Sequence, residues 1–256
     1  MYPKLFGIDF LDSYAIMLIL GVIAFTLVFF TKTKKYNFSK ILKENLVITF
    51  IISGCLMYVG AFVFDTIFHS IEEGKFVKGG ITFLGGFITG IITFVILIIK
   101  VMPYHKKNLM FFLNIIIIGI VIAHSLGRVG CFLAGCCYGK ETTSILGVTF
   151  PKGSTAYFLL GPNHSVLPTQ LIEAVFLFLL FIVLLIIKKH QFITYLFSYG
   201  IFRFILEFFR GDDRGSLFIL SPSQWLSIGL IITGIILLIK KPNETYTPSI
   251  KTDTSI

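Results

Sequence analysis

Long blocks of apolar residues are the feature that most restricts what this chain can fold into. Six blocks approach the roughly 20 residues that a helix needs to cross a bilayer, and a weaker seventh, Phe192–Ile205, contains two tyrosines and an arginine. The charged fraction of 14% also lies well below the roughly 25% typical of soluble domains. We therefore predict an all-α polytopic membrane protein with seven transmembrane helices, which satisfy their own backbone hydrogen bonds. The six strong blocks are Ile16–Phe30, Leu46–Phe64, Ile81–Ile99, Leu109–Ala123, Leu171–Ile187 and Trp225–Ile239.

The basic residues indicate how these helices are oriented. Thirteen of the 22 lysines and arginines lie in alternate loops and in the C-terminal tail, which places those segments inside and the N-terminus outside. The net charge of +9 is therefore a topology signal and does not indicate a nucleic-acid partner. The opening segment Met1–Tyr14 lacks the basic start, apolar core and cleavage site of a signal peptide, so we expect insertion through the spans themselves.

The arginines are distributed differently from the lysines. All four fall on the predicted outer side, whereas the inner loops use lysine alone. Anchoring needs only a charge, but the planar guanidinium with five donors suits bidentate binding of phosphate or carboxylate. This distribution favours an anion-binding site on the outer side. The four are Arg128, Arg203, Arg210 and Arg214.

We predict one membrane domain over residues 1–240 and a disordered cytoplasmic tail over residues 241–256, which is rich in Thr, Ser, Pro and Lys. The longest stretch between spans, residues 127–169, contains a short β-like run at Gly147–Pro151 and several turn residues. Loops of this length are usually functional. We expect this one to form a small outer-face cap over a site in the membrane.

Glycines cluster where the third apolar block begins. The spacing Gly86-x-x-x-Gly90 is typical of close helix packing through small residues. The alternative is an unwound entry where the backbone approaches a ligand. The cluster consists of Gly79, Gly80, Gly85, Gly86 and Gly90.

Three segments, His124–Gly139, Leu167–Glu173 and Tyr199–Asp213, hold nearly all the unusual polar residues. In their motifs and order the chain resembles the prolipoprotein diacylglyceryl transferases, from about residue 60 to about residue 235. The matching motifs are Gly79-Gly80-x-Thr82-Phe83-x-Gly85-Gly86, Gly127-Arg128-Val129-Gly130-x-Phe132, Phe150-Pro151, Pro168-x-Gln170-Leu171-x-Glu173, Tyr199-Gly200-x-Phe202-Arg203-x-x-x-Glu207-Phe208-Phe209-Arg210 and Ser223-Gln224-x-Leu226-Ser227.

The resemblance implies an enzyme that moves the diacylglyceryl group of phosphatidylglycerol onto a lipobox cysteine thiol of a prolipoprotein and releases glycerol phosphate. It implies no cofactor. The expected partners are this anionic phospholipid, the lipobox peptide and the bilayer. The expected location is the bacterial cytoplasmic (inner) membrane, with the C-terminus inside and the active site at the outer leaflet.

The charged residues of the motifs suit this chemistry. Arginines stabilise negative charge on a departing phosphate in a low-dielectric site, and carboxylates hold them in place because an unpaired charge at membrane depth is costly. Arg203 and Glu207 are four residues apart and share a helix face. The alternative is that such pairs only fix helix packing. The candidate catalytic residues are Arg128, Arg203, Glu207 and His124, and the candidate substrate-binding residues are Arg128, Glu173, Gln170, Arg210, Gly85, Gly86, Tyr138, Cys131 and Cys136.

Several positions depart from the family pattern. Cys131 stands where the family has Asn, Cys136 where it has an acidic residue, and Leu84 and Leu167 where it has histidines. His124 lies four residues before Arg128, on the same helix face, and is a candidate general base in place of the missing histidine. The alternative for His124 is an ordinary interfacial histidine.

The cysteines of the His124–Gly139 segment leave several interpretations open. The spacing Cys131-x-x-x-x-Cys136-Cys137 lacks the paired C-x-x-C of structural zinc sites, so we expect no metal. A disulfide from Cys131 to Cys136 or Cys137 is compatible with an outward position. The cysteines could also be packing residues, or one could be a nucleophile whose thiolate the nearby arginines favour. Cys55, in the second block, is expected in the core.

The sequence therefore predicts a phosphatidylglycerol-dependent diacylglyceryl transferase. Two alternatives are a related lipid-modifying enzyme with a different acceptor and a membrane thiol–disulfide protein built on the three cysteines. A third is a non-catalytic lipid-binding or transport protein.

Overall fold

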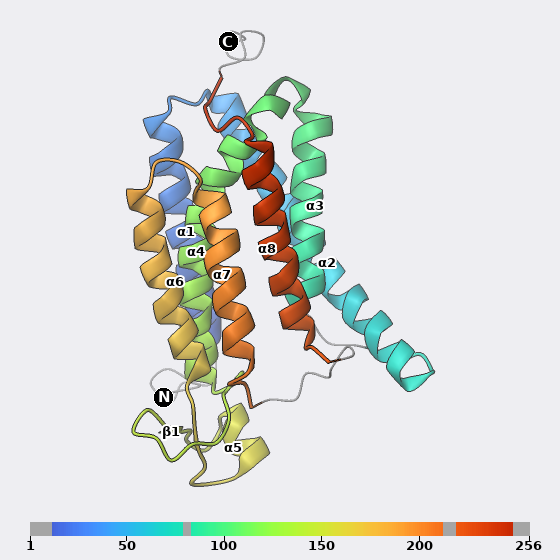
Figure 1. Cartoon of the computed structure of the whole chain (residues 1–256), viewed down its shortest axis with the longest axis vertical. Helices are drawn as coiled ribbons and strands as arrows, with labels where there is room; N and C mark the ends of the chain where they lie inside the picture. The colour runs from blue at the N-terminus through green and yellow to red at the C-terminus, as the bar shows by residue number, and fades with distance from the viewer. Residues whose placement is uncertain (1–11, 79–82, 212–218, 248–256) are drawn as a thin grey trace. The chain divides into compact units, whose positions relative to one another are not determined.

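The computed structural model describes residues 12–78, 83–211 and 219–247, and the structure over these ranges is mostly helical (Figure 1). Each apolar block coincides with a helix, although Ile81 and Thr82 lie outside the described residues. The elements are α1 (Ser13–Lys35), α2 (Lys40–Glu73), α3 (Phe83–Val101), the 3-10 helix η2 (Pro103–Asn108), α4 (Leu109–Ala134), β1 (Val148–Thr149), α5 (Thr155–Leu160), β2 (Ser165–Val166), α6 (Thr169–Ile186), α7 (Gln191–Glu207) and α8 (Pro222–Lys240).

Within the described ranges, five helical segments are long and apolar enough to cross a membrane. They are α1, residues 40–67 of α2, η2 together with α4, α6 and α8. The prediction of an all-α, multi-pass membrane protein is confirmed at this level. Seven spans stay a prediction, because the described apolar part of α3 is Gly85–Val101 and α7 has 17 residues.

The chain divides into two compact units, residues 1–32 with 113–242 and residues 33–112 with 243–256. In the second unit, α3 packs against α2 through glycines. A Cβ at Gly86 would lie 2.9 Å from the Met57 carbonyl oxygen, and one at Gly85 would overlap the Phe64 side chain. Gly79 and Gly80 lie outside the described residues, as does most of the Gly79–Phe83 part of the motif.

The first residues of the predicted tail make contacts in this second unit. Asn108 Nδ2 donates to the Thr247 carbonyl at 2.8 Å, and Thr247 N donates back to Asn108 Oδ1 at 3.0 Å. The Tyr246 ring lies 4.9 Å from that of Phe38. Residues 248–256 lie outside the described part, so disorder of the tail as a whole stays a prediction.

In the first unit, α4 makes contacts with α1, α6 and α7, among which it lies in Figure 1. Ser125 Oγ donates to the Ala174 carbonyl of α6 at 2.8 Å, and Asn114 Oδ1 accepts from the Phe192 backbone N–H of α7 at 2.8 Å. Gly119 leaves room for the Phe25 ring of α1. These contacts hold α4 as the helix on which the polar residues of the His124–Gly139 segment are presented.

The segment between α4 and α6 folds into a small structure of its own, beyond one end of α4, α6 and α7 (Figure 1). β1 and β2 pair antiparallel, with Val148 opposite Val166 and Thr149 opposite Ser165. This confirms the predicted β-like run. The placement of the α4–α6 segment on the outer face of the membrane stays a prediction. Its buried core consists of Tyr138, Phe150, Ala156 and Val166.

Helix α4 ends at a Schellman motif, which directs the chain into this segment. Gly135 has φ +72°, its N–H donates to the Phe132 carbonyl, and the Cys136 N–H donates to the Cys131 carbonyl. A Cβ at Gly135 would lie 2.6 Å from Ser154 Cβ. Glycine at this position therefore allows both the turn and the close approach of the α5 N-terminus.

Candidate functional site

Glu173 is the point at which three helices of the first unit meet. Its side chain on α6 has no exposed surface, and Oε1 lies 3.1 Å from Arg128 Nε of α4. Those two atoms are in ion-pair contact, although they do not meet hydrogen-bond geometry. Tyr199 of α7 donates its hydroxyl to the same oxygen at 2.9 Å. One carboxylate thus neutralises a buried guanidinium and ties it to two other helices.

His124 reaches the same carboxylate. Its Nε2 lies 3.8 Å from Glu173 Oε1, and its ring meets the Tyr199 ring edge-on with centroids 5.3 Å apart. The predicted common helix face of His124 and Arg128 is confirmed, since both side chains approach one oxygen atom. A histidine that contacts a carboxylate is held in a fixed orientation, which is what a general base requires.

A second buried ion pair joins α7 to the start of α8. Arg203 Nη2 lies 2.7 Å from Glu207 Oε2, with side-chain exposures of 5% and 6%. The same nitrogen donates to Ser223 Oγ at 3.1 Å, and Ser221 Oγ donates to Glu207 Oε1 at 2.9 Å. The predicted pairing of Arg203 with Glu207 on one helix face is confirmed. Tyr199, which donates to Glu173, and Arg203 lie four residues apart on α7, so this helix joins the two ion pairs in one network.

Neither of these two serines, Ser221 and Ser223, was predicted from the sequence as a site residue. Ser221 is the N-cap of α8 and forms a capping box with Gln224, with Pro222 in the first turn. The Ser-Pro-x-Gln pattern marks a helix start, and it also positions a hydroxyl for a carboxylate from the preceding helix. Ser223, which was noted only within a matching motif, provides the hydroxyl for Arg203.

Several buried atoms of the two ion pairs lack a hydrogen-bond partner among the described residues, namely Arg128 Nε, Glu173 Oε2, Arg203 Nη1 and Glu207 Oε2. Arg203 Nη1 is a donor among them. Buried donors are almost always satisfied in folded proteins. The other nitrogen of this guanidinium, Nη2, is already paired with Glu207. The N–H groups of Nη1 are therefore suited to donate to an anionic ligand, because the positive charge is already positioned and desolvated.

Gln170 and Thr169 hold the turn that follows α4. Gln170 Nε2 donates to the Cys136 carbonyl at 2.6 Å, and Thr169 Oγ1 donates to the Cys137 carbonyl at 3.0 Å. Gln170 is fully buried, and its Oε1 has no hydrogen-bond partner in the described part of the chain. The bond to a backbone carbonyl gives Gln170 a positioning role in addition to its predicted contact with substrate.

Tyr138 and Arg210 meet at the end of α7. Gly139 and Arg210 form an antiparallel β-bridge, the Gly211 N–H donates to the Tyr138 carbonyl at 3.1 Å, and both Tyr138 and Arg210 are buried. The Tyr138 ring belongs to the small buried core of the segment that connects α4 to α6 in the sequence. This pairing links the α7 end to the turn after α4.

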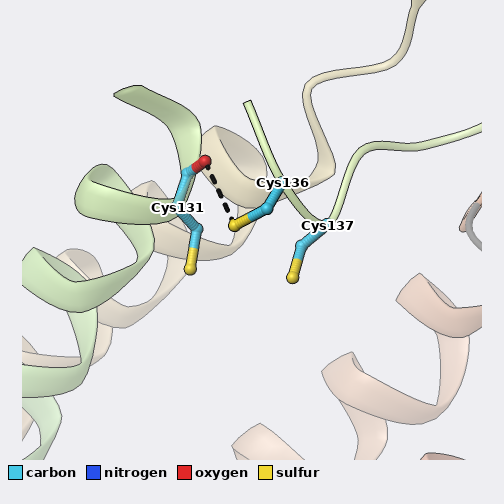
Figure 2. Close-up of side chains that lie close together, drawn as sticks. All are labelled: Cys131, Cys136 and Cys137. Carbon is cyan, nitrogen blue, oxygen red and sulfur yellow. Dashed lines mark hydrogen bonds between the residues drawn. The ribbon is translucent and has the colours of Figure 1, made fainter. Parts of the chain in front are cut away.

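In the described part of the chain, the three cysteines after Gly130 form no disulfide and are partly buried. Their sulfur atoms all lie within 4.8 Å of one another, and Cys136 Sγ lies 3.6 Å from the Cys131 carbonyl oxygen (Figure 2). The neighbouring thiols of Cys131 and Cys137, together with burial, raise the pKa of the Cys136 thiol. This is opposite to the effect expected from nearby arginines, and it leaves Cys136 a poor nucleophile. Cys55, expected in the core, is exposed on α2.

The structure thus places most predicted site residues in the first unit, whereas two belong to the second. Gly85 and Gly86 belong to the second unit, where they pack against α2. That contact matches the helix-packing interpretation of the glycine cluster. All the others lie in the first unit, in the two ion-pair groups or around the turn after α4.

Comparison with known families shows which proteins this chain is similar to in sequence. The family model for prolipoprotein diacylglyceryl transferase matches residues 3–240. The chain belongs to this family. The match extends over more of the chain than the motifs alone indicated, and it includes both ion-pair groups and the cysteines.

Individual relatives agree with the family match. The chain is 33% identical over 255 residues to phosphatidylglycerol–prolipoprotein diacylglyceryl transferase 2 of Clostridium perfringens, covering 91% of this chain and 92% of the relative. It is 34% identical over 244 residues to the corresponding transferase of Clostridium tetani, covering 91% and 93%. A Streptococcus agalactiae transferase is 31% identical over 252 residues, covering 91% and 92%. The predicted membership of a transferase family is confirmed.

Proposed function

We propose that this protein transfers the diacylglyceryl group of phosphatidylglycerol to the cysteine thiol of a prolipoprotein. The relatives that share about a third of its residues carry this activity in their names. The observation that carries the proposal is the buried pair of guanidinium groups, Arg128 and Arg203, each held by a carboxylate from the same or a neighbouring helix. Such a pair suits a lipid phosphate at membrane depth.

The reaction requires one bond to form and one to break. The acceptor sulfur attacks the glycerol carbon that carries the phosphate ester, a C–S bond forms, and the C–O bond to the phosphate breaks. The electron pair of that bond leaves with glycerol phosphate, and the thiol proton must be taken up by a base. Negative charge therefore develops on the phosphate oxygen, where arginine donors stabilise it most.

Each candidate residue has a role in this scheme. Arg203, through its unsatisfied Nη1, and Arg128 bind the phosphate, while Glu207 and Glu173 hold the two guanidiniums in place. His124, held against Glu173, takes the thiol proton. The transfer needs no metal or cofactor in this scheme, because electrostatic positioning supplies the stabilisation.

A direct assay tests the proposal. The purified chain is incubated in detergent with labelled phosphatidylglycerol and a lipobox peptide, and glycerol phosphate release and the mass of the peptide are followed. Arg128→Ala is expected to lose about 10²–10³ in rate, whereas Lys152→Ala, which removes an exposed charge from the α4–α6 segment, keeps wild-type turnover. Turnover by Arg128→Ala within a few-fold of wild type contradicts the role of the arginine.

A second candidate function is transfer to a different acceptor. It is favoured by the sequence positions at which this chain has Cys131, Cys136, Leu84 and Leu167 in place of the polar residues expected in the family. In the same assay, glycerol phosphate release without lipidation of the peptide means that the diacylglyceryl group passes to water or to another nucleophile present. That result supports this candidate and contradicts the prolipoprotein acceptor.

We also propose seven spans, an outward N-terminus and a site at the outer leaflet of the bacterial cytoplasmic membrane. The distribution of lysine and arginine supports this orientation. The orientation can be tested by labelling a cysteine introduced into the α4–α6 segment. Ile145 is 98% exposed and suits this purpose, whereas Ser154 is fully buried and does not. A cysteine at position 145, in a chain whose native cysteines are serine, is expected to react with an impermeant maleimide in intact cells. Labelling only after lysis places the segment inside and contradicts the topology.

A further inference from the structure

The turn after α4 gathers three thiols that the transfer reaction does not use. We call Cys131, Cys136 and Cys137 the cysteine cluster. Cys131 lies in the last turns of α4, and the other two follow the Schellman motif, so their sulfur atoms face one common space (Figure 2). In such a motif the residue after the glycine regularly contacts the residue five positions before it. The helix end therefore brings Cys136 back against Cys131.

The backbone at Cys137 completes the cluster. Cys137 has φ +62°, a left-handed conformation that residues with a side chain rarely adopt. The bonds from Thr169 and Gln170 to the carbonyls of Cys137 and Cys136 hold the chain in this conformation. Both hydrogen-bond donors are fully buried, so the position of the third thiol is fixed by the fold of α6 and does not depend on the thiols themselves.

We propose that the cysteine cluster binds one thiophilic metal ion of the Zn²⁺ class through three thiolates. The three sulfur atoms lie within 4.8 Å of one another. Zn–S bonds of about 2.3 Å at tetrahedral angles place sulfurs about 3.8 Å apart, a spacing that small side-chain rotations reach. Three thiolates leave a fourth position for water, which differs from the four-ligand sites whose paired C-x-x-C spacing this sequence lacks.

Thiol chemistry explains why a soft ion is the expected ligand. Thiolates select Zn²⁺ and similar ions over Mg²⁺ or Ca²⁺, which prefer oxygen. Each thiol loses its proton to bulk water when the ion binds, so no redox step or further reactant is needed. Binding is therefore expected to strengthen as pH rises, since protons compete less with the ion for the thiolates.

An ion at this position would have a structural consequence. It would join the end of α4 to the turn that leads toward β1. This turn already accepts hydrogen bonds from the first residues of α6, Thr169 and Gln170. Binding to the folded chain stabilises it by mass action. This inference does not depend on the acceptor or on the lipid donor.

The test uses the full chain in detergent, reduced and then freed of reductant. Cd²⁺ is added first, because thiolate–cadmium bonds absorb in the ultraviolet, and Zn²⁺ is then titrated against a chromophoric chelator. We expect one ion per chain, with affinity that increases with pH. Cys131→Ser, Cys136→Ser and Cys137→Ser are each expected to weaken binding at least tenfold. The matched control Cys55→Ser, at the remaining cysteine of the chain, is expected to bind as the wild type does.

A measurement on the wild type covers the case in which a variant fails to fold. The reduced chain is treated with N-ethylmaleimide with and without Zn²⁺, and the peptide spanning Gly130–Lys140, which holds all three thiols, is weighed. Zn²⁺ is expected to protect this peptide and to leave the reactivity of Cys55 unchanged. Absence of a cadmium–thiolate band, equal alkylation with and without Zn²⁺, or binding that depends on Cys55 overturns the proposal.

Discussion

Replacing Glu173 with glutamine removes the negative charge at the point where α4, α6 and α7 meet. The substitution keeps the shape of the side chain, but it leaves Arg128, whose side chain is only 11% exposed, without its carboxylate partner. Breaking a buried ion pair by removing one partner typically costs about 3–5 kcal/mol, because the remaining charge is uncompensated. We therefore expect Glu173→Gln to lower the free energy of unfolding by about this amount and to reduce transfer activity.

A double variant separates the structural effect from the catalytic one. In Glu173→Gln/Arg128→Gln no buried charge is left unpaired, and replacing both partners of such a pair is often nearly neutral. Most of the lost stability is expected to return, while activity stays low because the proposed phosphate ligand is gone. Tyr199→Phe is the matched control, because it removes only the hydroxyl that donates to Glu173. It should lower the free energy of unfolding by about 1.5–3 kcal/mol, as expected for one hydrogen bond to a charged group.

The assay is thermal unfolding of the purified variants in one detergent, with phosphatidylglycerol-dependent turnover measured on the same samples. A double variant as unstable as Glu173→Gln would show that the cost does not come from an unpaired Arg128. A Glu173→Gln variant as stable and as active as the wild type would refute the placement of this carboxylate at the centre of the network.

Three further predictions follow from the site and its supports. Arg203→Lys is expected to lose nearly as much turnover as Arg203→Ala, about 10²–10³ or 2.7–4 kcal/mol, because a point charge does not replace the planar guanidinium; near-normal turnover by the lysine variant contradicts this. Ser221→Ala loses both the α8 N-cap and the hydrogen bond to Glu207, so thermal unfolding should show a loss of about 1–3 kcal/mol, and an unchanged midpoint counts against the capping box. Gly135→Ala places a Cβ 2.6 Å from Ser154 Cβ at φ +72°, and we expect a loss of at least about 1–2 kcal/mol, measured by the same unfolding experiment; a neutral or stabilised variant is incompatible with the left-handed turn.

Local patterns in the sequence were enough to predict the helices and one of the ion pairs. The apolar blocks predicted the positions of the long helices because a span must satisfy its backbone internally over a fixed length. The spacing of Arg203 and Glu207 predicted their contact, since residues four apart on a helix are neighbours whatever surrounds them. The order of the motifs identified the family that the comparison confirmed.

Contacts between helices could not be derived in the same way. Glu173 is 45 residues from Arg128 and 26 from Tyr199, and only the packing of α4, α6 and α7 decides that all three share one oxygen. The spacing of the cysteines left a disulfide, packing residues and a nucleophile open, and only the structure shows that all three sulfur atoms lie within 4.8 Å of one another. The cysteine cluster depends on the left-handed backbone at Gly135 and Cys137 and on the carbonyl bonds from α6. The sequence by itself determined what each helix carries, because helix formation is local; the tertiary structure decided which charges and thiols meet, because burial forces distant polar groups to find partners.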